Sequence, residues 1–374
     1  MSDGRKRRRA KQARRDMRRA KMRDRKTRDE PSLTDVISGA LNGWHPLGLL
    51  SLASTLIRMA QPDPFPNWGS RQREPIDMDL VVASFSREKS RETSALLAVL
   101  AELMLNETDR QDRCRREAAA RNDPLPEWIS NLSHISVHRA VRATHVLGDE
   151  DELLLGAELP GGHELTCVVH LNHNMLSEVD DAYLLPQSID KVLSVSIERN
   201  TDPDVSFVDM NLADARAWID HGLEQPLLPT GSGTWPDCRA LVSWLASHLP
   251  EGGARFETPE WDWAPLSKLI RSFFVSPAGA PFNDFDNEVL LQELIDSGTG
   301  DPLRWSAARI ARLLDGLPLY GQHLPLKRVL EVPELLRAFV PFAHSESGIR
   351  NELTSKALAL IEEMASAYKQ EILD

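Results

Sequence analysis

The sequence predicts an α+β fold that is mostly α-helical, with a small antiparallel sheet near the middle of the chain. Three observations support this class. Apolar residues recur at helical spacing in residues 32–60 and in the first half of residues 86–123, and they alternate with other residues over 151–174. Helix signals then return from Asn211 onward. A chain of 374 residues, 41% of them hydrophobic, is long enough for two or three domains with a sizeable core.

The first part of the predicted fold is all-helical. Apolar residues at positions 33, 36, 37, 40 and 41 mark one helix, which Gly43 and Pro46 end, and a second apolar helix runs to about Ala60. Residues 86–123 are apolar in their first half and charged in their second. This pattern predicts one long helix, ended by Pro124 and Pro126.

The predicted sheet is centred on the stretch "DELLLGAELPGGHELTCVVHLNHN", residues 151–174. Its two alternating runs are separated by Pro160-Gly161-Gly162, which is typical of a hairpin. "SVHRAVRATHVL" before the hairpin and "DDAYLLPQ" after it extend the sheet, and "SIDKVLSVSIE" is expected to be a helix that covers it. Helices follow to the C-terminus, with Ser306 as an N-cap and Pro333 in a first helical turn. The expected domains are a disordered basic arm at 1–30, a helical domain at 31–132, the sheet with its covering helix at 133–205, and a helical domain at 206–374.

Charge is distributed very unevenly along the chain. Residues 1–28 hold 15 of the 44 Lys and Arg residues and 3 of the 56 Asp and Glu residues, so this basic arm carries a charge of +12. Residues 29–374 hold the other 29 basic and 53 acidic residues, which gives a charge of −24. Basic runs of this kind are typical of nucleic-acid-binding segments. The expected phosphate-binding residues are Arg7, Arg8, Arg9, Arg14, Arg15, Arg18, Arg19, Arg23 and Arg25.

The basic arm predicts a partner and gives no sign of export. Contacts to phosphate carry little sequence information, so the arm is expected to bind RNA or DNA without specificity. The acidic remainder of the chain is expected to compete with nucleic acid for the arm and to bind an unknown protein partner. No apolar run follows the arm directly, and the stretch Leu47 to Met59 is shorter than the ~20 residues of a membrane helix. A cytoplasmic protein without a membrane segment is therefore expected.

Candidate catalytic residues gather around "HLNHN". Histidine is a common metal ligand and general base, so His170 and His173, with Asp180 and Asp181, are candidates for a metal-assisted hydrolase. Side chains alternate along a strand, however, so these two histidines point to opposite faces unless a turn begins at Asn172. The alternative is that His170 lies on an open sheet face and "NHN" forms a polar turn. Neither a bound metal nor a cofactor is expected.

Two other motifs have simpler explanations than chemistry. "LIDSGTG", residues 294–300, resembles the aspartic-protease motif, but it follows an apparent helix, and a helix end with a glycine turn explains it. "NDFDNEV", residues 283–289, lacks the glycine and glutamate that a calcium loop requires, so helix capping is the better interpretation. The three cysteines are scattered and form no CxxC pair, which indicates neither a disulfide framework nor a thiolate metal site.

Several segments, among them "NGWHPLGLL", "WPDCRALVSWLASHLPEGG" and "GDPLRWSAARIARLLDGLP", resemble uncharacterised proteins of actinobacteria. The resemblance covers about residues 32–345, and it implies a bacterial cytoplasmic protein without assigning any functional residue. Together these observations predict a non-enzymatic protein with an acidic body for protein interaction and a basic arm for nucleic acid. The alternative is a hydrolase centred on His170 and His173.

Overall fold

The computed structural model describes residues 32–62, 74–225, 234–315 and 324–373. These described residues contain 15 α-helices and one five-stranded antiparallel sheet, which confirms the predicted class. The chain divides into two compact units, Met1–Ala60 with Ile76–Leu132 and Gln61–Pro75 with Ser133–Asp374. The basic arm and its nine candidate arginines lie outside the described residues.

The first unit is helical throughout the part that is described. Its α-helices are α2 (Leu33–Leu41), α3 (Leu47–Ala60), α4 (Met78–Arg87), α5 (Arg91–Leu103), α6 (Thr108–Arg121) and α7 (Glu127–Ser130). Helix α2 begins with a capping box, in which Ser32 and Asp35 bond each other's backbone N–H groups. The predicted break between α2 and α3 at residues 42–46 is confirmed.

The prediction of one long helix over residues 86–123 is wrong. Helix α5 ends at Leu103 because Met104 leaves helical geometry, with φ −84° and ψ 60°, and α6 begins at Thr108. The two helices fold back on each other, and Arg115 of α6 forms an ion pair with Glu102 of α5 at 3.5 Å. The change from apolar to charged sequence thus marks a turn between a core helix and a surface helix.

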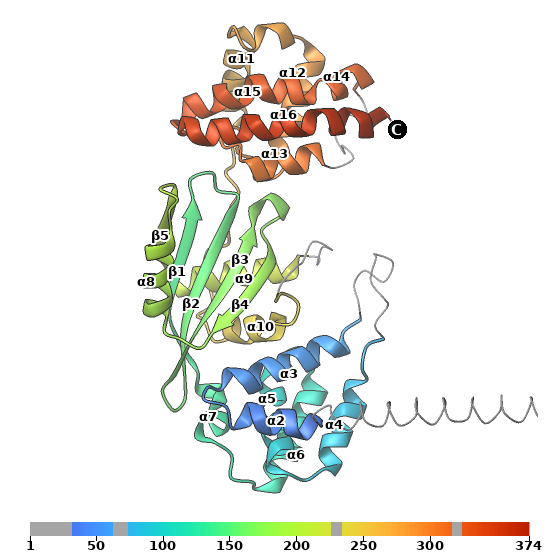
Figure 1. Cartoon of the computed structure of the whole chain (residues 1–374), viewed down its shortest axis with the longest axis vertical. Coiled ribbons are helices and arrows are strands. Elements are labelled where there is room, and N and C mark those ends of the chain that lie inside the picture. The colour runs from blue at the N-terminus through green and yellow to red at the C-terminus, as the bar shows by residue number, and fades with distance from the viewer. Residues whose placement is uncertain (1–31, 63–73, 226–233, 316–323, 374) are drawn as a thin grey trace, which may run out of the picture. The chain divides into compact units, whose positions relative to one another are not determined.

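The second unit contains the sheet, whose strands are ordered β4-β3-β2-β1-β5 and are all antiparallel (Figure 1). The strands are β1 (Ser136–His145), β2 (Glu150–Leu159), β3 (His163–Asn172), β4 (Glu178–Leu185) and β5 (Val205–Met210). The predicted hairpin joins β2 to β3. Its turn contains Gly161 and Gly162 at φ +90° and +78°, a conformation that L side chains rarely adopt.

Strand β5 is absent from the sequence prediction, which placed residues from 206 onward in a helical segment. It pairs with β1, from Ala140 opposite Met210 to His145 opposite Val205. The strand is only six residues long and lies at the sheet edge, where its side chains alternate between partly and largely exposed. In this short strand the apolar residues Phe207 and Val208 are adjacent, so its apolar alternation is weaker than that of β2 or β3.

Helices cover both faces of the sheet. On one face, α9 (Leu212–Glu224) packs against β1, β3 and β4, over the fully buried side chains of Leu153, Cys167 and Val169. On the other face, α8 (Ile189–Arg199) places Ile189 and Val192 in a cluster with Val141, Ala143, Leu154 and Val168. The predicted covering helix is therefore confirmed as α8, which Figure 1 shows beside β5.

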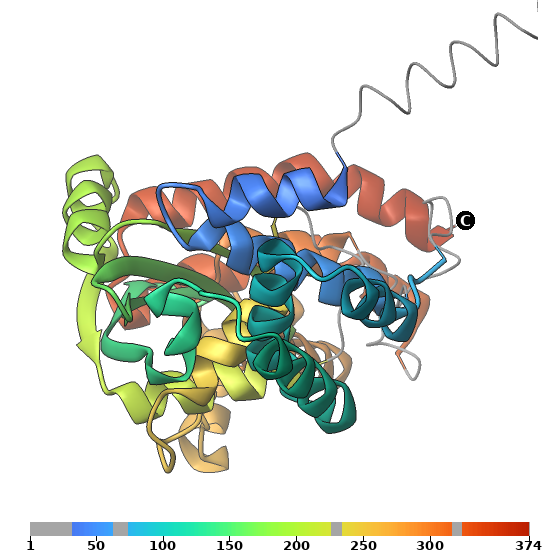
Figure 2. The ribbon, with the colours of Figure 1, turned by 90° about the horizontal axis from the view of Figure 1, so that it is seen from below.

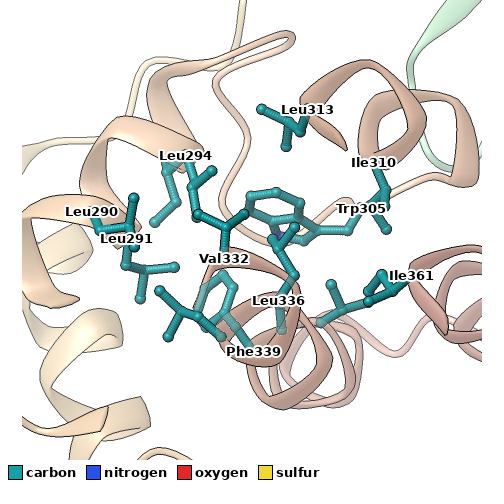
Figure 3. Close-up of a cluster of buried hydrophobic side chains, with 14 of the residues drawn as sticks. Leu290, Leu291, Leu294, Trp305, Ile310, Leu313, Val332, Leu336, Phe339 and Ile361 are labelled. Carbon is teal, nitrogen blue, oxygen red and sulfur yellow. The ribbon is translucent and has the colours of Figure 1, made fainter. Parts of the chain in front are cut away.

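The remaining helices of the second unit are α10 and the helices of a C-terminal bundle. They are α10 (Arg239–Ser247), α11 (Trp263–Val275), α12 (Phe285–Asp296), α13 (Ala307–Leu314), α14 (Leu326–Leu330), α15 (Val332–Ser347) and α16 (Asn351–Leu373). The long helix α16, red in Figures 1 and 2, packs against α13 and α15. Fully buried Trp305, Phe339 and Ile361 lie in the core of the bundle (Figure 3). Among the described residues, no helix combines the length and the apolar character needed to cross a lipid bilayer.

Local signals set the ends of these bundle helices as predicted. Ser306 accepts a hydrogen bond from the backbone N–H of Arg309 and caps α13, and Pro333 lies in the first turn of α15. Asp284 accepts from the backbone N–H of Asn287 and caps α12. The acidic stretch at residues 283–289 is therefore a helix start.

Candidate functional site

His170 lies on the sheet face that α8 covers. It follows Val168 at the strand spacing of two, and its side chain is 28% exposed. Its Nδ1 is 3.6 Å from Glu152 Oε1 on β2, and its ring centroid is 6.0 Å from that of Tyr183 on β4. A groove of about 550 Å³ opens beside it, between the strands and the last turns of α8. We call this pocket the acidic groove; its lining is Ala143, Thr144, His145, Glu150, Asp151, Glu152, His170, Val195, Ser196, Arg199, Asn200, Val205 and Phe207.

At this end of the sheet, carboxylates on β2 and β4 lie on either side of strand β3. Glu152 lies opposite His170, while Glu150 and Glu178 both lie opposite Asn172, one on each neighbouring strand. Asp180 lies at a register irregularity in β4, because Asp181 pairs with His170 and Val179 pairs with Leu171. Cross-strand neighbours on one face lie close together, so these negative charges influence one another.

The mutual influence raises the pKa of several of these carboxyl groups. Burial, and then the charge of Asp180, raise the pKa of Glu178 to about 7. Burial and the neighbouring charges of Asp180 and Asp149 raise the pKa of Glu150. Burial also raises the pKa of Asp180, and the nearby His170 partly offsets this rise. Desolvated carboxylates near like charges hold protons more tightly, and they are stabilised by a neighbouring cation.

His173 lies apart from His170 and is only 1% exposed. It begins the 3₁₀ turn His173–Met175, which Asn172 caps through the N–H of Asn174, so "NHN" forms a polar turn. Its Nε2 is 3.0 Å from Asp151 Oδ2, and its Nδ1 is 2.9 Å from Ser177 Oγ. Its ring stacks on that of Phe256, with centroids 3.7 Å apart.

Hydrogen bonds therefore connect Ser177, His173 and Asp151 in that order. The catalytic triad of a serine hydrolase has the same sequence of serine, histidine and aspartate. In such a triad the serine oxygen must meet the substrate. Ser177 is 3% exposed and lines none of the described pockets. Its backbone is left-handed at φ +59°, after Leu176 at φ +57°. The hydrogen bonds thus secure a tight turn between β3 and β4.

The two predicted aspartates have separate surroundings. Asp180 belongs to the carboxylates near His170. Asp181 Oδ1 instead accepts hydrogen bonds from the backbone N–H of Trp235, at 2.9 Å, and from the hydroxyl of Thr234, at 3.3 Å. The structure therefore brings Asp180 toward His170, while Asp181 fixes the segment before α10.

Another histidine meets the geometry of a metal site more closely. One ligand atom from each of His145, Asp202 and Asp204 lies within 4.8 Å of the others, and this is the one such group found among the described residues. Arg350 already donates from Nε to Asp204 Oδ1 at 3.0 Å, and His145 Nδ1 accepts from the N–H of Leu147 at 3.1 Å. The sequence offers little signal for this cluster, because the pairing of β1 with β5 brings its members together.

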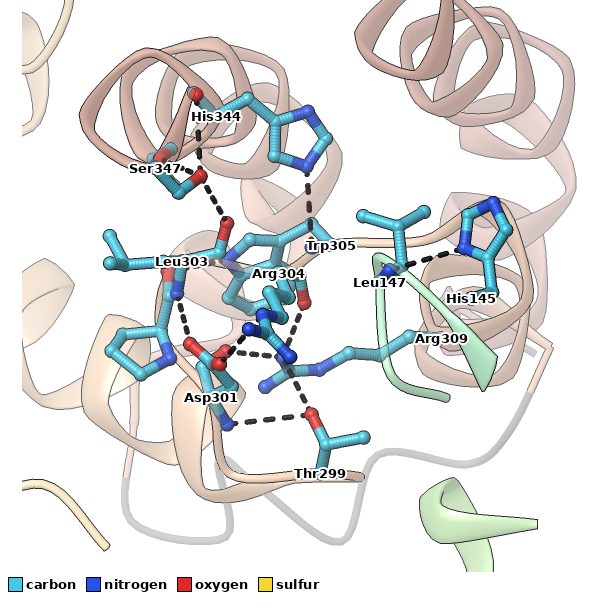
Figure 4. Close-up of polar contacts among 12 residues, drawn as sticks. His145, Leu147, Thr299, Asp301, Leu303, Arg304, Trp305, Arg309, His344 and Ser347 are labelled. Carbon is cyan, nitrogen blue, oxygen red and sulfur yellow. Dashed lines mark hydrogen bonds and ion pairs between the residues drawn. The ribbon is translucent and has the colours of Figure 1, made fainter. Parts of the chain in front are cut away.

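The segment that resembles an aspartic-protease motif surrounds a buried arginine (Figure 4). Helix α12 ends at Asp296, and Gly298 and Gly300 follow in left-handed conformations. Arg309, 1% exposed, donates to the carbonyl of Ser297 at 2.9 Å and lies 4.0 Å from the centre of the Trp305 ring. Burial lowers the pKa of its guanidinium to about 10. The segment is therefore part of the core of the bundle.

Comparison with models of known protein families, with curated proteins and with solved structures found no significant match for this chain.

Proposed function

We propose that this chain is a non-enzymatic tethering protein of the bacterial cytoplasm. Its basic arm, residues 1–28, binds the phosphates of RNA or DNA, and its acidic folded part binds a protein partner. The observation that carries the proposal is the separation of charge, with +12 on the arm and −24 on the rest of the chain. Arginine and lysine side chains that neutralise phosphates release counterions, which supplies affinity without sequence specificity.

The geometry near His170 and His173 favours this function over the alternative hydrolase. A hydrolase would need both imidazoles to face one accessible space. His170 faces the acidic groove, while His173 is buried between Asp151 and Ser177. The ligand atoms of the two histidines belong to no metal-binding group among the described residues. One equivalent of zinc in purified protein, lost on His170→Ala, would favour the hydrolase instead.

Binding of labelled RNA over a salt series tests the tethering function. We compare the full chain, a chain lacking residues 1–30, and a full chain with the nine candidate arginines replaced by glutamine. The truncation keeps Ser32, the N-cap of α2, so its melting temperature should match that of the full chain. We expect both variants to lose RNA binding.

The salt dependence separates phosphate contact from other modes of binding. If nine arginines each contact a phosphate, the log–log slope of affinity against salt should be roughly −6 to −8. An arm with the same composition in shuffled order serves as a matched control and should bind almost as well. Equal RNA affinity of the full and truncated chains would refute the proposal.

A further inference from the structure

Two adjoining pockets lie at the end of the sheet where β1 turns into β2. The outer pocket has a volume of about 430 Å³ and the inner pocket about 130 Å³, and Arg142, Thr144 and Arg304 line both of them. Arg142 pairs with the fully buried Leu153 of β2, and its guanidinium lies 5.4 Å from the ring centre of Trp218 on α9. This cation–π contact holds the guanidinium at the pocket wall.

The two arginines have hydrogen-bond donors to spare. Arg142 Nη1 is 3.9 Å from Asp151 Oδ2, and Arg304 Nε is 3.4 Å from Asp301 Oδ2 (Figure 4). Each guanidinium has five N–H groups, and neither donates a hydrogen bond to any residue that the structure describes. The side chains are 33% and 47% exposed, so a ligand can reach them. Two such groups beside one pocket favour an oxyanion, because a guanidinium can bond two of its oxygens at once.

The strands add two hydroxyl groups to the outer pocket. Thr144 of β1 pairs with Ser206 of β5, and both residues line this pocket. Arg142 lies two residues before Thr144, so their side chains leave the same face of the sheet. Within the described ranges, neither hydroxyl takes part in a hydrogen bond. Two guanidinium groups and two hydroxyls suit a phosphate group, which offers more oxygens than a carboxylate does.

Carboxylates around the arginines restrict the size of an anionic ligand. Asp301 and Glu257 line the inner pocket, and Asp204 lines the outer one. A nucleic acid would bring its further phosphates close to these groups, and like charges placed side by side oppose binding. A molecule with a single terminal phosphate avoids this repulsion.

The inner pocket provides acceptors for the rest of such a molecule. Asp151, Glu257 and Asp301 are part of its lining. Asp151 is 3% exposed, and its Oδ1 has no hydrogen-bond partner among the described residues. Buried carboxylate oxygens are ordinarily satisfied by donors. Hydroxyl or amino groups on the ligand would supply donors to this pocket.

We propose that the two pockets together bind a small phosphate ester that carries hydroxyl or amino groups. Its phosphate lies between Arg142 and Arg304 in the outer pocket, and its hydroxyl or amino groups lie beside the carboxylates of the inner pocket. The outer pocket alone is within the roughly 300–1,000 Å³ typical of small-molecule sites. This site depends neither on the basic arm nor on the tethering function.

Titration calorimetry of the full chain tests the ligand class with four probes. They are glucosamine 6-phosphate, glucosamine, inorganic phosphate and acetate. We expect glucosamine 6-phosphate to bind most tightly, inorganic phosphate to bind more weakly, and the two probes without phosphate not to bind measurably. The proposal is overturned if neither phosphate probe binds at millimolar concentration, or if glucosamine or acetate binds as tightly as its phosphate counterpart.

Substitution of Arg304 tests the site itself. Arg304→Gln should weaken the binding of glucosamine 6-phosphate on the order of tenfold or more, because it removes charged donors. Arg304→Lys keeps the charge without the planar fork and should restore only part of the affinity. The matched control is Arg337→Gln, at a residue of α15 with a side chain 44% exposed. Equal affinity of Arg304→Gln and this control would contradict the assignment.

Two further measurements keep the test decisive. If Arg304→Gln does not fold, Ser206→Ala replaces it, since Ser206 is exposed on the edge strand and its loss should still weaken binding by roughly twofold to tenfold. Unchanged affinity of that variant would count against the site. RNA in excess should leave the binding of glucosamine 6-phosphate to the full chain unchanged. Competition by RNA would assign the pockets to nucleic acid and overturn the proposal, whereas loss of RNA binding by the arm would refute the tether alone.

Discussion

Glu178 provides the sharpest test of the electrostatics at the acidic end of the sheet. Glu178 is 5% exposed, and its carboxylate accepts no hydrogen bond among the described residues. Its charged neighbours are Asp180 and Arg312. Its pKa rises from 4.5 to about 7. The folded chain therefore keeps a proton on Glu178 at pH values where the unfolded chain has released it. The resulting stabilisation is complete below about pH 4.5 and is lost as the pH rises toward 7.

The substitution Glu178→Gln removes this pH dependence because glutamine stays neutral. A pKa difference of one corresponds to about 1.4 kcal/mol, so a rise from 4.5 to about 7 corresponds to roughly 3 kcal/mol. We expect the variant to match the unmodified chain at pH 4.5. At pH 8 it should be more stable by up to about 3 kcal/mol, since ionised Glu178 then destabilises only the unmodified chain.

Urea unfolding at a series of pH values, followed by tryptophan fluorescence, measures this difference. Glu158→Gln is the matched control, because Glu158 is an exposed residue of the same sheet, on strand β2. Its stability difference from the unmodified chain should not change over the same pH range. The reasoning would be refuted if Glu178→Gln raised the free energy of unfolding equally at every pH, or if it lowered that free energy at pH 8.

Three further predictions concern the turns of the second unit and are checked by melting temperature and urea unfolding. Ser177→Ala should destabilise the fold by about 1–3 kcal/mol, because the buried His173 Nδ1 loses its partner; no change would show that the turn does not depend on this bond. Leu176→Gly should stabilise by up to about 1 kcal/mol, since an exposed leucine at φ +57° is strained and glycine is not; a lower melting temperature would contradict this. Gly298→Ala should destabilise by about 2 kcal/mol or more, because φ is +66° and the new Cβ would lie 2.7 Å from Asn174 Oδ1; a variant of unchanged stability would show that the turn yields easily.

Much of the fold follows from local sequence signals. The β2–β3 hairpin is visible from alternation on both sides of Pro160-Gly161-Gly162, and the capping by Ser306 and Asp284 is visible from single residues. These elements were predictable because their determinants lie within one helical turn or one hairpin. The break at Met104 was not, because helix-compatible residues continue through a turn that the packing of α6 on α5 imposes.

The candidate site was only partly predictable for the same reason. Alternation along β3 separates His170 from His173 without any knowledge of the fold. The carboxylates around His170 come from β2 and β4, and their proximity depends on a register that includes an irregularity between His170 and Leu171. The grouping of His145 with Asp204 needs the edge strand β5, whose pattern is too short to identify from sequence.

Gly156 fixes how closely α8 approaches the sheet. A Cβ at this position would lie 2.6 Å from Cγ2 and 2.8 Å from Cβ of Ile189, the first residue of α8. Any side chain there would push the start of the helix outward, while Val195 and Arg199 near its end form a wall of the acidic groove. The absence of a side chain at Gly156 therefore sets the distance between the start of α8 and the sheet. A methyl group there would tilt α8 and so change the width of the groove at the other end of the helix.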